Sequence, residues 1–233
     1  MKLEKLTERI WYYPFEPERD RPNLGYILGD KWSLAVDAGH SKAHTEEFYA
    51  AVKEAGLPLP CLTVLTHWHW DHTLGMHAVN GLCLANKLTN EHLRELSKRI
   101  KERGEEEFLS IDERIRKEYE GGKPVIVTLS DMVFTGEMSL DPGGCPVRIF
   151  QTEAPHTDDS TLIYAVNEKV LFLGDSTNGS VPDWKKDLVK LKKLRDTVAA
   201  IDAEICIDSH YTPLTKKEVL DDFDEEFSGS GVL

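Results

Sequence analysis

Residues 62–72 read LTVLTHWHWDH, a short apolar run followed by four potential metal ligands, His67, His69, Asp71 and His72. In an extended chain, side chains two positions apart point the same way, so His67 and His69 can bind one ion together. A turn beginning after His69 would direct Asp71 and His72 elsewhere. This arrangement favours two adjacent ions over a single one.

The complete motif is a stronger signal than any one of its residues. At this chain's own histidine and aspartate frequencies, HxHxDH arises by chance in roughly one sequence in a thousand. Trp68 and Trp70 alternate with the first ligands and should face the other side of the segment, where we expect them to pack.

Three further candidate ligands follow predicted apolar strands: His156 after residues 147–150, Asp175 after 170–173 and His210 after 205–207. Open α/β layers place their sites at the carboxyl ends of strands, so these side chains can converge on the HxHxDH segment. Because the ligands extend from His67 to His210, we expect one domain spanning residues 1–233.

The remaining pattern mixes α and β along the whole chain. Further strands are predicted at residues 10–13, 25–28, 33–36, 62–65, 125–128 and 161–166, and helices at 44–55, 89–103, 105–120, 184–201 and 216–223. The charged stretch 86–122 is predicted to be a helical insertion, either a solvated hairpin or a cap over the site. The end of the chain, 221–233, is expected to fray.

The charge balance excludes some classes of partner. The 233 residues include 28 basic and 41 acidic side chains, a formal net charge of −13. Binding to nucleic acid or to anionic lipid needs clustered Lys and Arg, so we expect neither partner. No apolar run approaches a membrane span, and residues 1–9 lack a signal-peptide core, which predicts a cytoplasmic location.

The chain resembles the metallo-β-lactamase superfamily. The resemblance rests on the HxHxDH motif, His156, Asp175 and His210 in the family's order, together with residues 23–28 (NLGYIL) and 36–39 (VDAG). It implies an α/β fold, a four-layer αββα sandwich of two mixed sheets with helices outside. It also implies the ligand sets: His67, His69 and His156 for one ion, Asp71, His72 and His210 for the other, and Asp175 between them. Asp37 resembles the family's aspartate beside the metals.

This donor set suits two divalent ions, with zinc expected and iron or manganese as alternatives. The expected nucleophile is a metal-bound hydroxide, and Asp71 is the expected catalytic residue because it can both bind metal and transfer a proton. His40 is a candidate for the rim of the site. Tyr211 could donate a hydrogen bond to an oxyanion.

Several reactions fit such a site, because one fold hosts many chemistries. The first hypothesis is hydrolysis of a small carbonyl substrate: a lactone, a thioester, or an amide including a lactam. An iron-dependent oxidoreductase resembling the persulfide dioxygenases, with one metal, is the alternative from another class. Phosphodiester hydrolysis is chemically reasonable but conflicts with the net charge of −13. The sequence leaves the substrate and the oligomeric state open.

Overall fold

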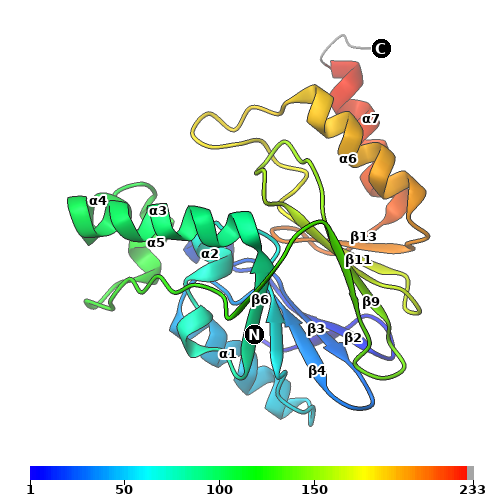
Figure 1. Cartoon of the computed structure of the whole chain (residues 1–233), viewed down its shortest axis with the longest axis horizontal. Coiled ribbons are helices and arrows are strands. Elements are labelled where there is room, and N and C mark those ends of the chain that lie inside the picture. The colour runs from blue at the N-terminus through cyan, green and yellow to red at the C-terminus, as the bar shows by residue number, and fades with distance from the viewer. Residues whose placement is uncertain (230–233) are drawn as a thin grey trace.

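The computed structural model describes residues 1–229 and consists of two β-sheets with helices outside them (Figure 1). The first sheet contains, in spatial order, β1 (Glu4–Lys5), β2 (Ile10–Tyr13), β3 (Leu24–Leu28), β4 (Ser33–Val36), β5 (Leu62–Val64), β6 (Leu82–Asn86) and β7 (Met132–Phe134). Strands β1 to β4 pair antiparallel and β4 to β7 pair parallel. The sheet is therefore mixed.

The second sheet is also mixed. Its order is β13 (Leu214–Thr215), β12 (Ile205–Asp208), β11 (Val170–Gly174), β10 (Thr161–Ala165), β9 (Val147–Gln151) and β8 (Glu137–Leu140). Only β11 and β12 pair in parallel; the other neighbours are antiparallel. The parallel pair matters for function, because both of its strands end at the same edge of the sheet.

The main core lies between the two sheets. Buried side chains from both sheets form one cluster, which includes Ile10, Ile27, Leu34, Val64, Ile149, Ile163, Phe172 and Ile207. Alternate residues of each strand point into this layer, as expected for sheets that pack face to face. Two further clusters join the outer faces of the sheets to helices. These layers form the predicted αββα sandwich.

The helices occupy both outer layers (Figure 1). They are α1 (Lys42–Glu54), α2 (Trp70–Thr73), α3 (Lys87–Arg103), α4 (Glu105–Leu109), α5 (Glu113–Glu118), α6 (Leu188–Ala200) and α7 (Lys216–Gly229), with 3-10 turns at Pro17–Arg19 and Met76–Ala78. Side-chain caps fix several starts: Ser41 accepts a hydrogen bond from the His44 backbone N–H, and Asp187 accepts from Val189 and Lys190.

The charged insertion shares an apolar cluster with the first sheet, which contributes Cys83 and Ala85. Leu93, Leu96, Phe108 and Ile115 from α3, α4 and α5 are buried in one cluster. A buried ion pair also joins α5 to the segment before β3, because Glu118 accepts two hydrogen bonds from the Arg21 guanidinium, each 2.9 Å long. The insertion is therefore packed against the sandwich.

Four predictions about local structure were wrong. Residues 125–128 form no strand, because Val125 and Val127 pack against the helical cluster and join no ladder. The predicted helix 105–120 is divided in two, since Asp112 caps α5 by accepting from the Arg114 N–H. Helix α6 begins at Leu188 and not at residue 184. Helix α7 continues to Gly229 where fraying was expected, and residues 230–233 lie outside the described part.

Among residues 1–229, none of the helices combines the length and the apolar character that crossing a bilayer requires.

Candidate metal centre

The predicted ligands meet at one edge of the sandwich, and they come from both sheets. The HxHxDH segment follows β5, and helix α2 begins at Trp70, directly after His69. This turn separates the first two histidines from Asp71 and His72, as the sequence suggested. His156 lies in the loop between β9 and β10, whereas Asp175 and His210 follow the parallel strands β11 and β12. Every one of these side chains except His210 is buried.

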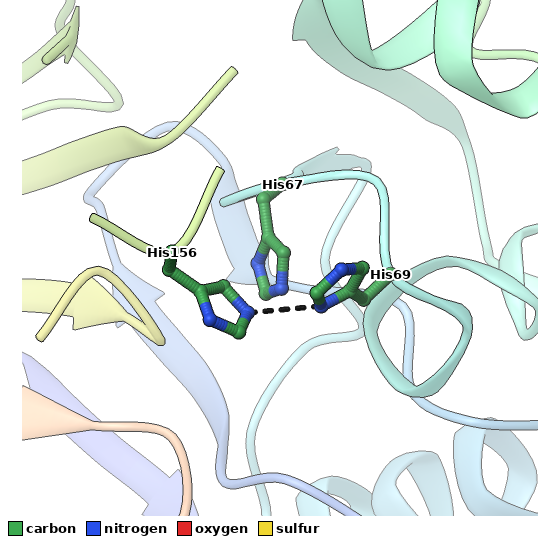
Figure 2. Close-up of side chains that lie close together, drawn as sticks. All are labelled: His67, His69 and His156. Atoms are coloured by element: carbon green, nitrogen blue, oxygen red, sulfur yellow. Dashed lines mark hydrogen bonds between the residues drawn. The ribbon is translucent and has the colours of Figure 1, made fainter. Parts of the chain in front are cut away.

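The first group consists of His67, His69 and His156 (Figure 2). One ligand nitrogen or oxygen from each residue of a group lies within 4.8 Å of the others. His69 Nδ1 and His156 Nε2 face each other at 2.9 Å. Two imidazole nitrogens at this distance share a proton, and a cation in its place could accept both lone pairs. The group therefore offers a compact set of nitrogen donors.

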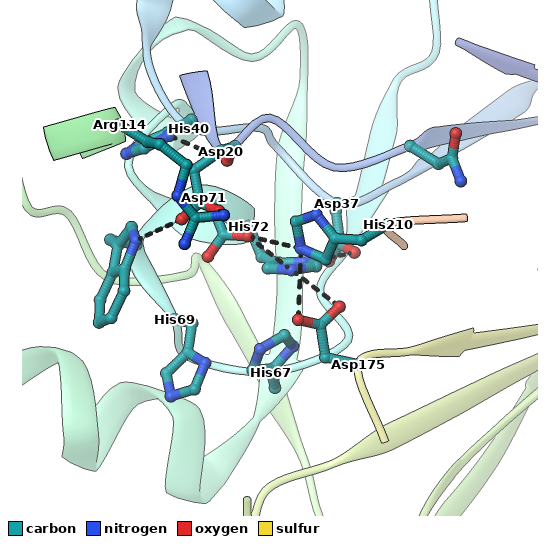
Figure 3. A network of polar contacts seen from close by, with 12 residues as sticks. Asp20, Asp37, His40, His67, His69, Asp71, His72, Arg114, Asp175 and His210 are labelled. Carbon is teal, nitrogen blue, oxygen red and sulfur yellow. Dashed lines mark hydrogen bonds and ion pairs between the residues drawn. The ribbon is translucent and has the colours of Figure 1, made fainter. Parts of the chain in front are cut away.

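The second group consists of Asp71, His72, Asp175 and His210 (Figure 3). His210 Nε2 lies 3.1 Å from Asp71 Oδ2 and 3.3 Å from Asp175 Oδ2. The other oxygen of Asp175 is 3.4 Å from His72 Nε2. Asp175 Oδ2 is also 3.7 Å from His156 Nε2, so this carboxylate faces both groups.

Asp37 fixes the orientation of His72. Its Oδ2 accepts a hydrogen bond of 2.8 Å from His72 Nδ1, which leaves Nε2 facing the other acidic residues. The same carboxylate accepts from the backbone N–H of Thr66 at 2.7 Å and from its hydroxyl. Asp37 has a positive φ of 65°, an uncommon conformation that aspartate tolerates better than most residues. The carboxylate thus contacts the predicted site through His72.

His156 is oriented by a loop of the second sheet. Its Nδ1 donates a hydrogen bond of 2.7 Å to the carbonyl oxygen of Gly179, in the segment between β11 and α6. This bond fixes the tautomer in which Nε2 is unprotonated and faces His69.

The two groups differ in their protonation. Burial, with His72 adding to its effect, lowers the pKa of His67 well below its ordinary value, and burial together with His156 lowers that of His69 to about 3. Burial acts against the charged forms of Asp71 and His72 as well, but there the opposite charges outweigh it. The pKa of Asp71 is lowered and that of His72 is raised. The first group therefore presents neutral imidazoles, and the second presents paired charges.

A cleft of about 670 Å³ gives access to these groups. The proposed ligands His69, Asp71, Asp175 and His210 line it. The helical insertion contributes Arg99, Ile111, Asp112 and Arg114 to the wall, and other segments contribute Phe15, Pro17, Val181, Pro182 and Trp184. The sequence did not identify these wall residues, because their apolar or charged side chains carry no motif.

The remaining predicted residues lie in different surroundings. Tyr211 is exposed and lines the cleft. The rim position expected for His40 is wrong, because its side chain is completely buried and its Nδ1 contacts the carbonyl oxygens of Arg19 and Asp20. Trp70 packs in the apolar cluster between the insertion and the first sheet, and it also lines the cleft. Trp68 lines the cleft too, between the rings of His69 and His92.

Comparison with known proteins agrees with this geometry. The family model described as "Metallo-beta-lactamase superfamily" matches residues 20–210. A search of curated proteins found no match. Among solved structures, a metallo-beta-lactamase from Pontibacter korlensis is similar at 18% identity and a TM-score of 0.67, covering 96% of this chain and 98% of that one.

Two other solved structures show the same likeness. A metallo-beta-lactamase from Hirschia baltica has 21% identity and a TM-score of 0.64, with 97% of each chain covered. A metallo-beta-lactamase family protein from Thermus thermophilus has 19% identity and a TM-score of 0.66, covering 97% of this chain and 82% of that one. At these identities the structures show a shared fold, and together with the family model they establish that this chain belongs to the metallo-β-lactamase superfamily.

Proposed function

We propose that the chain is a hydrolase that uses two divalent metal ions to cleave a small carbonyl substrate. Proteins of this fold are generally hydrolytic enzymes that bind divalent metals. One observation carries the proposal. Within the two ligand groups, four buried nitrogen and oxygen atoms lack a hydrogen-bond partner among the described residues, namely Nε2 of His67, His69 and His72 and Oδ1 of Asp175. A buried polar atom without a partner costs about 1–3 kcal/mol, so a cluster of them needs an occupant.

The donor chemistry fits metal ions. His67, His69 and His156 would hold one ion, and Asp71, His72 and His210 the other, with Asp175 shared between them. Nitrogen and carboxylate donors without thiolates suit zinc, although iron and manganese accept the same ligands. When bound, two such metal ions supply a hydroxide nucleophile at neutral pH and polarise the substrate carbonyl.

The chain's own residues complete the mechanism. Asp37 fixes the His72 ring through Nδ1, and the Gly179 carbonyl does the same for His156, so that Nε2 of each ring faces the other proposed ligands. Asp71 is buried and lines the cleft, and its Oδ2 lies 3.1 Å from His210 Nε2. From that position its carboxylate can take a proton from the attacking water and later pass it to the leaving group.

Metal analysis combined with a substrate panel tests the proposal. The full chain is loaded with zinc, iron or manganese and assayed on a lactone, a thioester, nitrocefin and bis-p-nitrophenyl phosphate. Two ions per chain with turnover of a carbonyl substrate is the expected result. One iron per chain with oxygen uptake on a persulfide substrate, or turnover of the phosphodiester alone, would refute it.

A further inference from the structure

Exposed apolar side chains gather around the cleft of the proposed site. Ile111, Val181, Trp184 and Tyr211 are 44%, 37%, 53% and 57% exposed, and all four line this cleft. Large apolar side chains are costly to leave in water, and when they gather around a hollow they mark a binding surface for apolar groups.

Trp184 is held in place by its loop. Its backbone φ is +55°, which is strained for a residue with a bulky side chain. Its backbone N–H donates a hydrogen bond of 2.8 Å to the Ser180 carbonyl oxygen. Gly179 is required for this fold of the loop, because a Cβ there would lie 2.0 Å from the Trp184 carbonyl oxygen. The indole ring stacks on His156 at an angle of 22°, with 6.0 Å between centroids. The tryptophan is thus placed directly beside a proposed metal ligand.

A second cleft adjoins the first. It has a volume of about 1060 Å³ and shares Asn178, Trp184 and Tyr211 with the metal cleft. Apolar side chains of the loop before α6, of α6 itself, of β13 and of α7 line it, including Leu188, Leu214, Val219 and Phe223. Figure 1 shows the loop before α6 extending away from the α6–α7 pair. The two clefts therefore adjoin at the three residues they share, and a path from the metal cleft into the second cleft would cross Trp184 and Tyr211.

The charges along this path disfavour an anionic group. In the metal cleft both arginines are already paired, Arg99 with Glu107 and Arg114 with Asp112. In the second cleft the lining acids are Asp208, Asp222, Glu225 and Glu226, and the lining Lys186 is paired with Glu226. An anionic end group would meet uncompensated carboxylates there.

We propose that the substrate carries an extended apolar arm, an acyl or arylalkyl chain without a terminal negative charge, which lies over Trp184 and Tyr211 and enters the second cleft. This inference rests on the proposed hydrolysis of a carbonyl group, because the reacting end of the same molecule occupies the metal cleft. Each methylene group buried in the second cleft then contributes to recognition.

A homologous ester series measures this contribution. With the metal-loaded full chain and p-nitrophenyl esters from acetate to octanoate, kcat/KM should rise about two- to fourfold per added methylene group. Octanoate with a terminal carboxylate should lose most of that gain. Trp184→Ala, and Thr212→Trp, which fills the second cleft without lining the first, should each lower the octanoate-to-acetate ratio at least tenfold. Val189→Ala is the matched control, because Val189 is exposed and apolar but lines neither cleft.

Binding to the metal-free chain gives a readout that is independent of hydrolysis. The neutral fluorophore N-phenyl-1-naphthylamine should bind to the wild type and to Val189→Ala, and at least tenfold more weakly to Trp184→Ala and Thr212→Trp. If esters are hydrolysed with no dependence on chain length and the fluorophore does not bind, the apolar arm is refuted while the hydrolase stands. The apolar arm is also refuted if kcat/KM rises with chain length but Trp184→Ala and Thr212→Trp both keep the wild-type octanoate-to-acetate ratio. If the fluorophore binds as expected and no ester is turned over, the proposed hydrolysis fails, and binding of apolar groups in the second cleft is supported.

Discussion

Replacing Asp37 by asparagine should weaken binding of one metal ion while preserving the fold. Asn adopts a positive φ as readily as Asp, and its oxygen can still accept from the Thr66 N–H, so the backbone at φ 65° is kept. The bonds lost are those that Oδ2 accepts from His72 Nδ1 and from the Thr66 hydroxyl, each 2.8 Å long in the wild type, although the hydroxyl keeps its 3.0 Å bond to Oδ1. A hydrogen bond to a charged group is worth about 1.5–3 kcal/mol.

That free energy has a direct counterpart in metal affinity. When His72 loses its carboxylate partner, the ring can turn or carry its proton on Nε2, which is the atom that faces Asp71 and Asp175. Loss of such an orienting partner weakens metal binding about 10- to 100-fold. We therefore expect the dissociation constant of the ion at Asp71, His72 and His210 to rise about 10- to 100-fold. The dissociation constant of the ion at His67, His69 and His156 should change less.

Competition with a chromophoric chelator measures both affinities, and circular dichroism checks the fold. Asp131→Asn is the matched control, because Asp131 accepts one backbone N–H, from Cys83 at 2.8 Å, and is not among the proposed ligands or the cleft residues. It should leave both affinities within about twofold. Unchanged affinity for both ions in Asp37→Asn would refute the orienting role of this carboxylate.

Three more outcomes are expected. Asp175→Ala should lose metal and hydrolysis together, because both oxygens of Asp175 face the histidines, and full metal stoichiometry by elemental analysis would contradict its shared position. Glu118→Ala should lower the free energy of unfolding in urea by about 3–5 kcal/mol, because it leaves a buried arginine without its main partner, whereas Glu106→Ala, in an exposed pair, should not move the midpoint. Burial, with Arg21 adding to its effect, lowers the pKa of His44 well below 6.5. Below pH 6.5 the unfolded chain therefore binds a proton at His44 and the folded chain does not. The free energy of unfolding should then fall by up to about 1.4 kcal/mol per pH unit. His44→Gln should flatten this slope in thermal unfolding of the metal-free chain, and an unchanged slope would show that the residue does not titrate in this way.

The sequence was most informative where a local pattern sets the geometry. The spacing of the HxHxDH motif predicted that His67 and His69 point one way and that Asp71 and His72 point another. The start of α2 at Trp70 produces this change of direction. The convergence of later ligands was also predictable, because strands that run parallel in a sheet end at the same edge. That the sheets form an αββα sandwich came from the resemblance and was confirmed by the structure.

The errors arose where tertiary contacts decide. Residues 125–128 have a strand-like composition, but a strand exists only if a neighbour pairs with it, and the apolar side chains there pack on helices. The very short strands β1 and β13, with two residues each, owe their existence to their partners in the ladder. A rim position was expected for His40 because a histidine near a site suggests function, whereas its burial depends on Tyr119, far along the chain. The cleft walls depend in the same way on contacts between distant segments.

The division of the proposed ligands between the two sheets links metal binding to assembly of the sandwich. Four ligands follow β5 of the first sheet, and three follow strands of the second, so neither sheet alone contains either complete group. A metal ion can then bind with full affinity only after the sheets have docked, and once bound it joins them at their open edge. At a free metal concentration 100 times the dissociation constant, this linkage adds about 2.7 kcal/mol to the folded state. Metal uptake during refolding should therefore follow sheet docking in time and report when that step is complete.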